Sequence, residues 1–214
     1  MPKCKACKKA FNPQYPKQAC CSIRCAIELS KIKDEVQKQE MRHVREWKKA
    51  KKTEHKKHGH YESDLQTEIN AIIRIIDKGQ YCISHQGPGK KINAGHYHSV
   101  GANNSIRFNL LNIWLQCESC NGYKSSNRSG YDVGLVAIFG QDHWLYINQG
   151  IVRDYPIIKM SIPELIEKTK LARSIKNRLL ANPPLIMSDE DRWRIREEIN
   201  EEIGIYHKSQ FYQP

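Results

Sequence analysis

The chain has 214 residues, of which 39% are apolar, and a mean hydropathy of −0.69, which favours several small metal-stapled units over one large core. It contains no run of about 18 apolar residues, which excludes a membrane span, and its start, MPKCKACKKA, lacks the apolar stretch of a secretion signal. The net charge of +12 is concentrated in residues 1–60, where 17 Lys/Arg face 6 Asp/Glu, and this indicates a polyanionic partner such as nucleic acid.

Residues 1–27 form the first predicted segment, a zinc module. We expect a cytoplasmic protein, and in a reducing compartment clustered cysteines indicate metal ligands before disulfides. Two short-spaced pairs can enclose one tetrahedral zinc ion. The predicted ligands are Cys4, Cys7, Cys21 and Cys25, with Cys20 as an alternative to Cys21. Whether this module is a DNA-binding finger or an inert cap stays open.

Residues 28–60 are the second segment, a long basic helix or linker. No Gly or Pro occurs between Ser22 and His58, and the composition favours helix. One interpretation is a solvated helix; the other is an arm that follows DNA phosphates, with an affinity that falls as salt rises. The predicted DNA-binding residues are Arg42, Arg45, Lys48, Lys49, Lys51, Lys52, Lys56 and Lys57.

Residues 61–145 are the third segment, which holds a helix and a second metal site. Ser63 and Gln66 match a capping box, so we expect a helix that begins there and ends at Gly79. Two pairs with two-residue spacing then enclose a 31-residue segment, which predicts a second structural zinc. Its predicted ligands are Cys82, His85, Cys117 and Cys120.

The last predicted segment, 146–214, is helical. Just before it, Tyr131–Phe139 is apolar enough for a buried helix, and HWLYIN around Trp144 suggests a short strand. Ser161 begins a further helix that runs to about Leu180, and Ser188 caps a last one. We interpret residues 161–203 as a helical hairpin that serves packing or dimerisation.

The second zinc loop also carries a histidine and an asparagine, in AGHYHS and RFNLLNIWLQC, and a second asparagine follows Cys120 directly, in CNGYKSSN. This arrangement resembles the HNH (His-Me finger) nucleases. More narrowly, these motifs and Tyr131 resemble the NinG (Rap) family of phage recombination endonucleases, which also has the cysteine cluster, basic helix and helical C-terminus in this order. The resemblance covers most of the chain and is specific over residues 82–131.

The resemblance implies a small α+β fold with a ββα-metal core and a metal-dependent endonuclease of branched DNA, such as Holliday junctions and D-loops, in the host cytoplasm. A neutral histidine suits the activation of water, and His96 is the expected general base. Asn112 is expected to hold the hairpin backbone, and Asn121 to ligate Mg²⁺ or Mn²⁺. Lys124, one turn beyond Asn121, is expected to contact phosphate.

One position departs from the HNH pattern. Most HNH motifs have Asp, Glu or His immediately before the base, where this chain has Gly95. Asn93 and His98 are the nearest substitutes as ligands. We favour His98, because on an extended strand it would share a face with His96.

Three functions stay open at this level. The first is the structure-selective endonuclease, for which a homodimer would explain paired cuts across a junction. The second is a non-catalytic zinc-containing DNA-binding protein, favoured by the missing acidic ligand at Gly95. The third is an HNH nicking nuclease without junction preference.

Overall fold

The computed structural model describes residues 1–54, 56–123 and 127–207. By contacts the chain divides into two compact units, Met1–Lys56 and Lys57–Pro214, which we describe separately. The predicted segments 61–145 and 146–214 both lie in the second unit. None of the described helices is long and apolar enough to cross a membrane.

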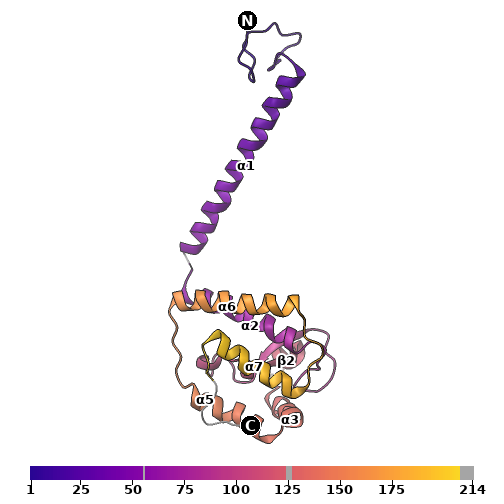
Figure 1. Cartoon of the computed structure of the whole chain (residues 1–214), viewed down its shortest axis with the longest axis vertical. Helices are drawn as coiled ribbons and strands as arrows, with labels where there is room; N and C mark the ends of the chain where they lie inside the picture. Colours follow the sequence, from indigo (N-terminus) through magenta and orange to yellow (C-terminus); the bar gives the residue numbers. More distant parts are fainter. Residues whose placement is uncertain (55, 124–126, 208–214) are drawn as a thin grey trace. The chain divides into compact units, whose positions relative to one another are not determined.

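The first unit consists of a cysteine-bearing loop region and one long helix, α1 (Ile23–Glu54; Figure 1). A single bridge between Lys3 and Ala10 closes the loop that begins the chain. The predicted uninterrupted helix is confirmed. Most of its described apolar side chains, including Ile32, Val36 and Trp47, are exposed, whereas Leu29 near its start is half-buried.

The second unit begins with α2 (His58–Ile76). The helix start predicted at Ser63 is wrong: Lys57 is the N-cap, and its backbone N–H donates to His60 Nδ1 at 3.1 Å. The fit of Ser63 and Gln66 to a capping box was coincidental, since Ser63 lies inside the helix. The apolar spacing was informative, because Leu65, Ile69, Ile72, Ile73 and Ile76 are all buried.

The sheet has two antiparallel strands, β1 (Ile92–His96) and β2 (Ile113–Cys117). Ile92 pairs with Cys117 and His96 with Ile113. Because neighbouring side chains of a strand face opposite ways, the sheet serves two cores. Ile113 and Leu115 join the core of α2, whereas Trp114 joins the other core.

Several short turns connect and follow these strands. They are η1 (Asn104–Ile106), η2 (Leu110–Asn112) and the π-helical η3 (Ser119–Tyr123). The helix expected at Tyr131–Phe139 is confirmed as α3 (Arg128–Phe139), but only one face of it is buried, at Tyr131, Gly134 and Leu135. The strand expected around Trp144 is wrong. That stretch is α4 (Gln141–Leu145) and η5 (Tyr146–Gly150), followed by α5 (Ile151–Asp154), and it buries Ile147 and Ile151 in the second core.

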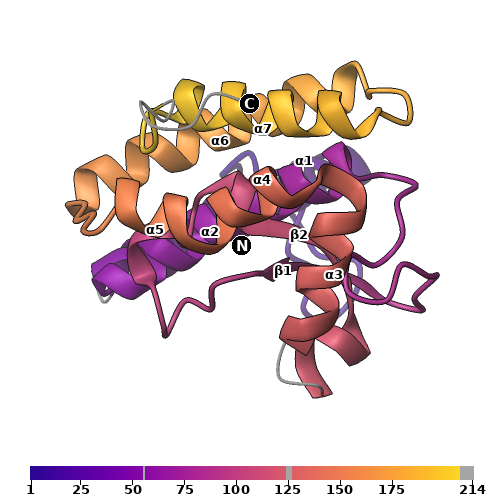
Figure 2. The same ribbon diagram turned by 90° about the horizontal axis from the view of Figure 1, so that it is seen from below.

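The predicted helical hairpin is confirmed as α6 (Ile162–Ala181) and α7 (Asp189–Ile203). Ser161 and Glu164 form the expected capping box, and Ser188 Oγ accepts from Asp191 N at 3.1 Å. Figure 2 shows α6 and α7 side by side, with α2 next to them. Since α2 also contacts both strands, the hairpin supports the sheet through α2.

A buried ion-pair network joins α2, β2 and α7. Asp77, which caps the C-terminal end of α2, is fully buried and accepts from Arg192 Nε at 3.0 Å and Arg196 Nη2 at 2.6 Å. Its Oδ2 also accepts from Leu115 N at 3.3 Å. The Arg196 guanidinium lies 3.8 Å from the ring centroid of Trp114. This network fixes β2, and with it the residues that follow β2.

Candidate active site and metal centres

The N-terminal cysteines form a four-thiol cluster. The sulfur atoms of Cys4, Cys7, Cys21 and Cys25 all lie within 4.8 Å of one another. Cys21 Sγ is 3.6 Å from both Cys7 Sγ and Cys25 Sγ. Four thiolates around zinc at about 2.3 Å are spaced about 3.8 Å apart, so this cluster could hold a metal ion such as zinc. Cys21 belongs to the cluster, and Cys20 is buried outside it.

The pKa values of two thiols in this cluster shift in opposite directions. A hydrogen bond from the Cys21 backbone N–H lowers the pKa of Cys4 to about 6. Hydrogen bonding to the thiols of Cys25, Cys7 and Cys4 raises the pKa of Cys21 to about 12. Closely spaced thiolates repel one another, and a bound dication removes that repulsion.

The second cluster consists of Cys82, His85, Cys117 and Cys120, again within 4.8 Å of one another. His85 Nε2 donates to Pro88 O at 3.3 Å, so its Nδ1 carries the lone pair, which faces Cys120 Sγ at 3.6 Å and Cys117 Sγ at 3.8 Å. Burial opposes ionisation of Cys117, but hydrogen bonds with Ser119, Cys120 and Cys82 together outweigh it and lower that thiol's pKa to about 6. This cluster, too, could hold a metal ion such as zinc.

The cysteines carry no competing disulfides. All eight lie in the described part of the chain, and all eight are free thiols. The second cluster ties the turn before β1 to the end of β2, because Cys117 N donates to Cys82 Sγ at 3.3 Å. It therefore closes the loop that carries His96 and Asn112.

His96 is the last residue of β1. Its Nε2 donates to the backbone carbonyl of Arg107 at 2.9 Å, so the neutral ring carries its lone pair on Nδ1. No described group hydrogen-bonds to that Nδ1. Burial lowers the pKa of His96 below its ordinary 6.5. The imidazole is thus held neutral at pH 7, with one nitrogen able to accept a proton.

Asn112 joins the end of η2 to the segment just beyond β1. The residue is fully buried, and its Oδ1 accepts from His98 N at 2.8 Å. Its Nδ2 donates to His98 O at 3.1 Å and to Ile106 O at 3.3 Å. The Asn112 amide thus fixes the backbone at both ends of the loop between β1 and η2, at His98 and at Ile106.

Asn121 lies on η3, directly after Cys120, and its amide oxygen approaches β1 at Gly95. A Cβ at Gly95 would lie 3.1 Å from Asn121 Oδ1. Because strand neighbours face opposite ways, Asn121 lies on the Gly95 face and His96 projects from the next position. His96 therefore projects away from the face that carries Asn121, although the two residues approach β1 at adjacent positions. Lys124 lies outside the described residues.

His98 does not share a strand face with His96, because β1 ends at His96. The expectation that His96 and His98 share one face of an extended strand was therefore wrong. Its Nε2 donates to Ile147 O at 2.9 Å, and burial lowers its pKa below 6.5. The other alternative, Asn93, pairs in register with Gln116.

The sequence interpretation missed Gln116 and Arg128. Gln116 precedes Cys117 on β2, and its side chain fills the space beside Gly95. Arg128 begins α3, donates to Tyr97 O at 3.0 Å and lies 3.4 Å from the Tyr97 ring centroid. Gln116 lies within the RFNLLNIWLQC motif and Arg128 just after CNGYKSSN, but only the strand register and the packing of α3 show that both lie at this end of the β1–β2 hairpin.

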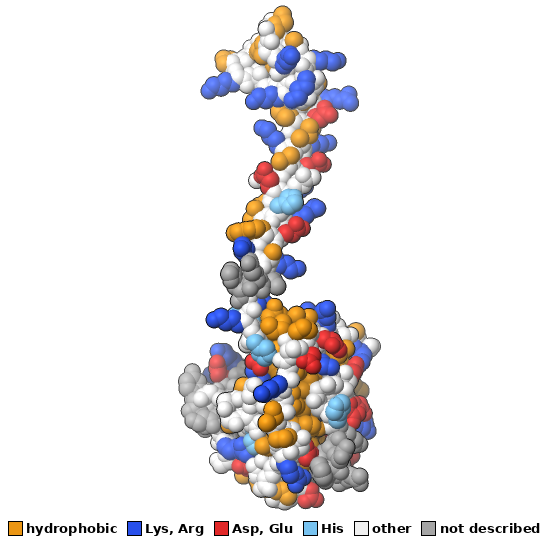
Figure 3. Space-filling model, turned by 90° about the vertical axis from the view of Figure 1, so that its left-hand side faces the viewer, with side chains coloured by type: hydrophobic (Ala, Val, Ile, Leu, Met, Phe, Trp, Pro, Cys, Tyr) orange, Lys and Arg blue, Asp and Glu red, His pale blue; other side chains and the backbone are white. Residues whose placement is uncertain are grey.

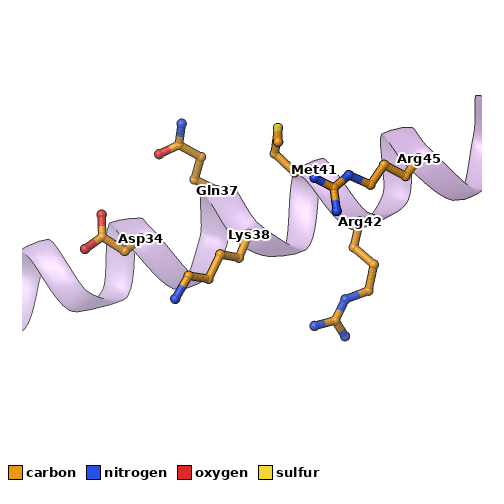
Figure 4. Close-up of a pocket in the computed structure, with 6 residues that line it drawn as sticks. All are labelled: Asp34, Gln37, Lys38, Met41, Arg42 and Arg45. Carbon is orange, nitrogen blue, oxygen red and sulfur yellow. The ribbon is translucent and has the colours of Figure 1, made fainter.

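The predicted DNA-binding residues are distributed over both units. Arg42, Arg45, Lys48, Lys49 and Lys51 lie on α1 and are exposed, Lys56 follows α1, and Lys57 caps α2 in the second unit. The side chain of Lys52 lies outside the description. Figure 3 shows basic side chains along the visible face of α1, interleaved with acidic and apolar ones. A shallow hollow on α1 is lined by Lys38, Arg42 and Arg45 together with Asp34, Gln37 and Met41 (Figure 4).

Comparison with known proteins gives one family. Residues 1–181 match the family described as Bacteriophage Lambda NinG protein. The chain is 32% identical over 149 residues to protein ninG of Escherichia phage lambda, covering 64% of this chain and 73% of that protein. It is 33% identical over 153 residues to protein ninG of Escherichia phage 933W, covering 65% and 76%. No solved structure matches the chain.

Proposed function

The chain belongs to the NinG family of phage proteins, and on that premise we propose that it is a metal-dependent endonuclease that hydrolyses phosphodiester bonds in branched DNA. The substrates would be recombination intermediates such as Holliday junctions and D-loops. The choice of a branched substrate rests on the family resemblance alone, since no motif in the chain encodes a branch point.

The observation that carries the proposal is the state of His96 at the end of β1. A general base must be neutral at working pH and must present a lone pair to water. Arg107 O holds Nε2, burial keeps the ring neutral, and Nδ1 is left to accept a proton. Two antiparallel strands followed by η3, with its Asn121, agree with a ββα-metal core.

The groups beside Gly95, the residue before His96, also suit a divalent ion. Asn121 Oδ1 is a hard donor beside the end of β1, and hard oxygen donors suit Mg²⁺ or Mn²⁺. Few protein ligands are needed, because Mg²⁺ usually keeps several waters and takes phosphate oxygens. When bound, such an ion would neutralise charge on the phosphate and on the leaving oxygen.

We assign the following roles in the hydrolysis to the residues of the chain. His96 Nδ1 takes a proton from water, whose oxygen attacks phosphorus. The bond from phosphorus to the 3′ oxygen breaks, leaving a 5′-phosphate and a 3′-hydroxyl that is protonated from solvent. Asn112 keeps the segment after His96 in place during this step, and Lys124 is the predicted phosphate contact.

The remaining parts would bind DNA. The exposed basic residues of α1 supply phosphate contacts that are insensitive to base sequence. The two clusters that could hold zinc would act structurally, one in each unit. A homodimer would place two active sites on a two-fold junction.

A second function is favoured by one observation, the absence of a side chain at Gly95. Without an acidic ligand there, the chain would be a zinc-containing DNA-binding protein that does not cut. The proposal and this alternative differ in turnover, not in binding.

The experiment is incubation of the zinc-loaded full chain with a Holliday junction, a D-loop and linear duplex, each with Mg²⁺, Mn²⁺ or EDTA. The proposal predicts cuts in the branched substrates with either ion and none with EDTA. Equal cutting of the linear duplex would indicate a nicking nuclease without junction preference. Binding without any cut would favour the non-catalytic protein.

A further inference from the structure

Gly95 holds the position where HNH motifs carry a metal-ligating side chain, and the structure gives a steric reason for the glycine. A Cβ at Gly95 would overlap Gln116 Oε1 and would lie 2.9 Å from Gln116 Cβ. Real Cβ atoms do not approach their neighbours so closely. The Gly95 backbone is also fixed, because Tyr131 Oη donates to Gly95 O at 2.9 Å. Gly95 is therefore the residue that lets Gln116 cross the face of β1.

Gln116 brings an oxygen donor into that same space. Its Oε1 lies where the Gly95 side chain would begin, and Asn121 Oδ1 lies 3.1 Å from that point. The orientation of the amide is set, since Nε2 donates to Ser84 Oγ at 2.7 Å and Oε1 must then face the other way. Gln116 is fully buried, whereas Asn121 is partly exposed, so this pair of amide oxygens meets solvent on the Asn121 side.

Both oxygen donors belong to residues that are adjacent in sequence to cysteines of the second cluster. Gln116 directly precedes Cys117, and Asn121 directly follows Cys120. Ser84, which orients the Gln116 amide, lies between Cys82 and His85. A zinc ion in that cluster would hold all three of these residues in place without touching the catalytic ion.

We propose that Gln116 supplies the catalytic divalent ion with the oxygen ligand that Gly95 cannot provide, so that Gln116 and Asn121 together form the protein part of its shell. This inference rests on the proposed nuclease function. A neutral amide in place of a carboxylate leaves the ion weakly held, so that it depends on DNA phosphate and water for its remaining ligands.

The test is titration of the zinc-loaded full chain with Mn²⁺, with free Mn²⁺ measured by electron paramagnetic resonance. Gln116→Glu keeps the length and adds a charge, and we expect its Kd for Mn²⁺ to fall about tenfold or more, because ligand charge sets affinity at such sites. Gln116→Leu keeps the bulk and removes the oxygen, and its Kd should rise about tenfold or more. The matched control is Gln37→Glu on α1, whose Kd should equal that of the wild type.

Zinc content of two per chain identifies variants with an intact cluster. If Gln116→Leu loses zinc, Ser84→Ala decides the question, since it keeps the oxygen and removes only its orientation; a weaker Kd supports the ligand role and an unchanged Kd overturns it. A folded Gln116→Leu protein that binds Mn²⁺ like the wild type also overturns it, and Gln116 is then packing. DNA cleavage is scored separately: a wild type that binds Mn²⁺ through Gln116 but never cuts contradicts the nuclease and not the ligand.

Discussion

The proton affinity of His96 decides when the proposed base can act. Burial lowers its pKa below 6.5, so the imidazole is neutral at pH 7 and becomes protonated only in more acidic solution. We predict that kcat/KM for junction cleavage is flat near pH 7 and falls as the pH drops through this lowered pKa. A pH profile at saturating Mg²⁺ measures it. An acidic limb centred above 6.5 would contradict the assignment.

The same burial has a consequence for stability with a definite sign. The unfolded chain binds a proton at His96 more readily than the folded chain does, so protonation favours unfolding. Any contribution of neutral His96 to the free energy of unfolding is lost as the pH falls below about 6.5. His98 shifts in the same direction because of its own burial, so the two effects add.

Asn112 is the residue whose loss should most disturb the hairpin loop. Asn112→Ala would leave the backbone groups of His98 and Ile106 without their partner in a buried place, which costs about 1–3 kcal/mol. Urea unfolding of the zinc-loaded protein measures the loss. The control is Asn177→Ala at an exposed position of α6, where we expect a change below about 0.5 kcal/mol. Equal values for the two variants would contradict the role given to Asn112.

At the residue scale the sequence predicted the two cysteine/histidine clusters better than it predicted side-chain contacts across the sheet. Spacing alone gave both metal clusters, because two residues between ligands is a constraint of the metal itself. It could not give Gln116, since that residue approaches Gly95 across the sheet and only the strand register shows it. The strand face expected for His98 was wrong for the converse reason, because an extended strand was assumed beyond the point where β1 ends.

The β1–β2 hairpin is the element whose structure should depend on a zinc ion in the second cluster. We predict two zinc ions in the wild-type chain and one in Cys120→Ser. We also expect Cys120→Ser to lose the near-ultraviolet circular dichroism of the buried Trp114, because the end of β2 is no longer tied to Cys82 and His85. Mass spectrometry of metal content and the dichroism spectrum measure this.

The control for that prediction is Cys7→Ser, in the first unit. It should also retain one zinc, yet it should leave the Trp114 signal unchanged, because the cluster of Cys7 lies in a different unit. Two zinc ions retained in Cys120→Ser would rule out the second cluster as a zinc site.

The basic helix α1 should act through phosphate contacts. Replacement of Arg42, Arg45 and Lys48 by Gln should reduce the slope of log K against log salt by about 2.7, since each lost phosphate contact removes about 0.9. Fluorescence anisotropy with labelled duplex measures the slope. Replacement of the exposed Lys78, Lys159 and Lys170 by Gln keeps the charge change equal and should leave the slope nearly constant. A similar reduction in both variants would show that only net charge matters.

At the scale of elements, capping patterns were informative only where tertiary contacts agreed with them. Ser161 and Ser188 begin helices as predicted, whereas Ser63 lies inside α2, because the buried row that starts at Leu65 is preceded by Tyr61, which also packs on the core. The stretch around Trp144 was taken for a strand, yet it is helical because Ile147 and Ile151, four residues apart, both reach the second core.

The second unit as a whole depends on a charge cluster that no local pattern reveals. Asp77 lies 115 or more positions from Arg192 and Arg196 in the chain, and it is fully buried with both. We predict that Asp77→Ala destabilises the unit by about 3–5 kcal/mol, because the buried Arg196 loses its counter-charge and Arg192 keeps only its described pair with Asp189. Urea unfolding at pH 7 measures the change. Glu202→Ala, which breaks the exposed pair with Arg178, is the control and should cost about 1 kcal/mol or less.

The most direct test of the account is single-turnover cleavage of a Holliday junction in Mg²⁺ by the wild type and by His96→Ala, each zinc-loaded and each at a concentration that saturates binding. Loss of a general base should slow cleavage by about 100-fold or more, while the Kd for the junction stays within about twofold of the wild type. Cleavage by His96→Ala at the wild-type rate would contradict the assignment of this histidine, and with it the proposed active site.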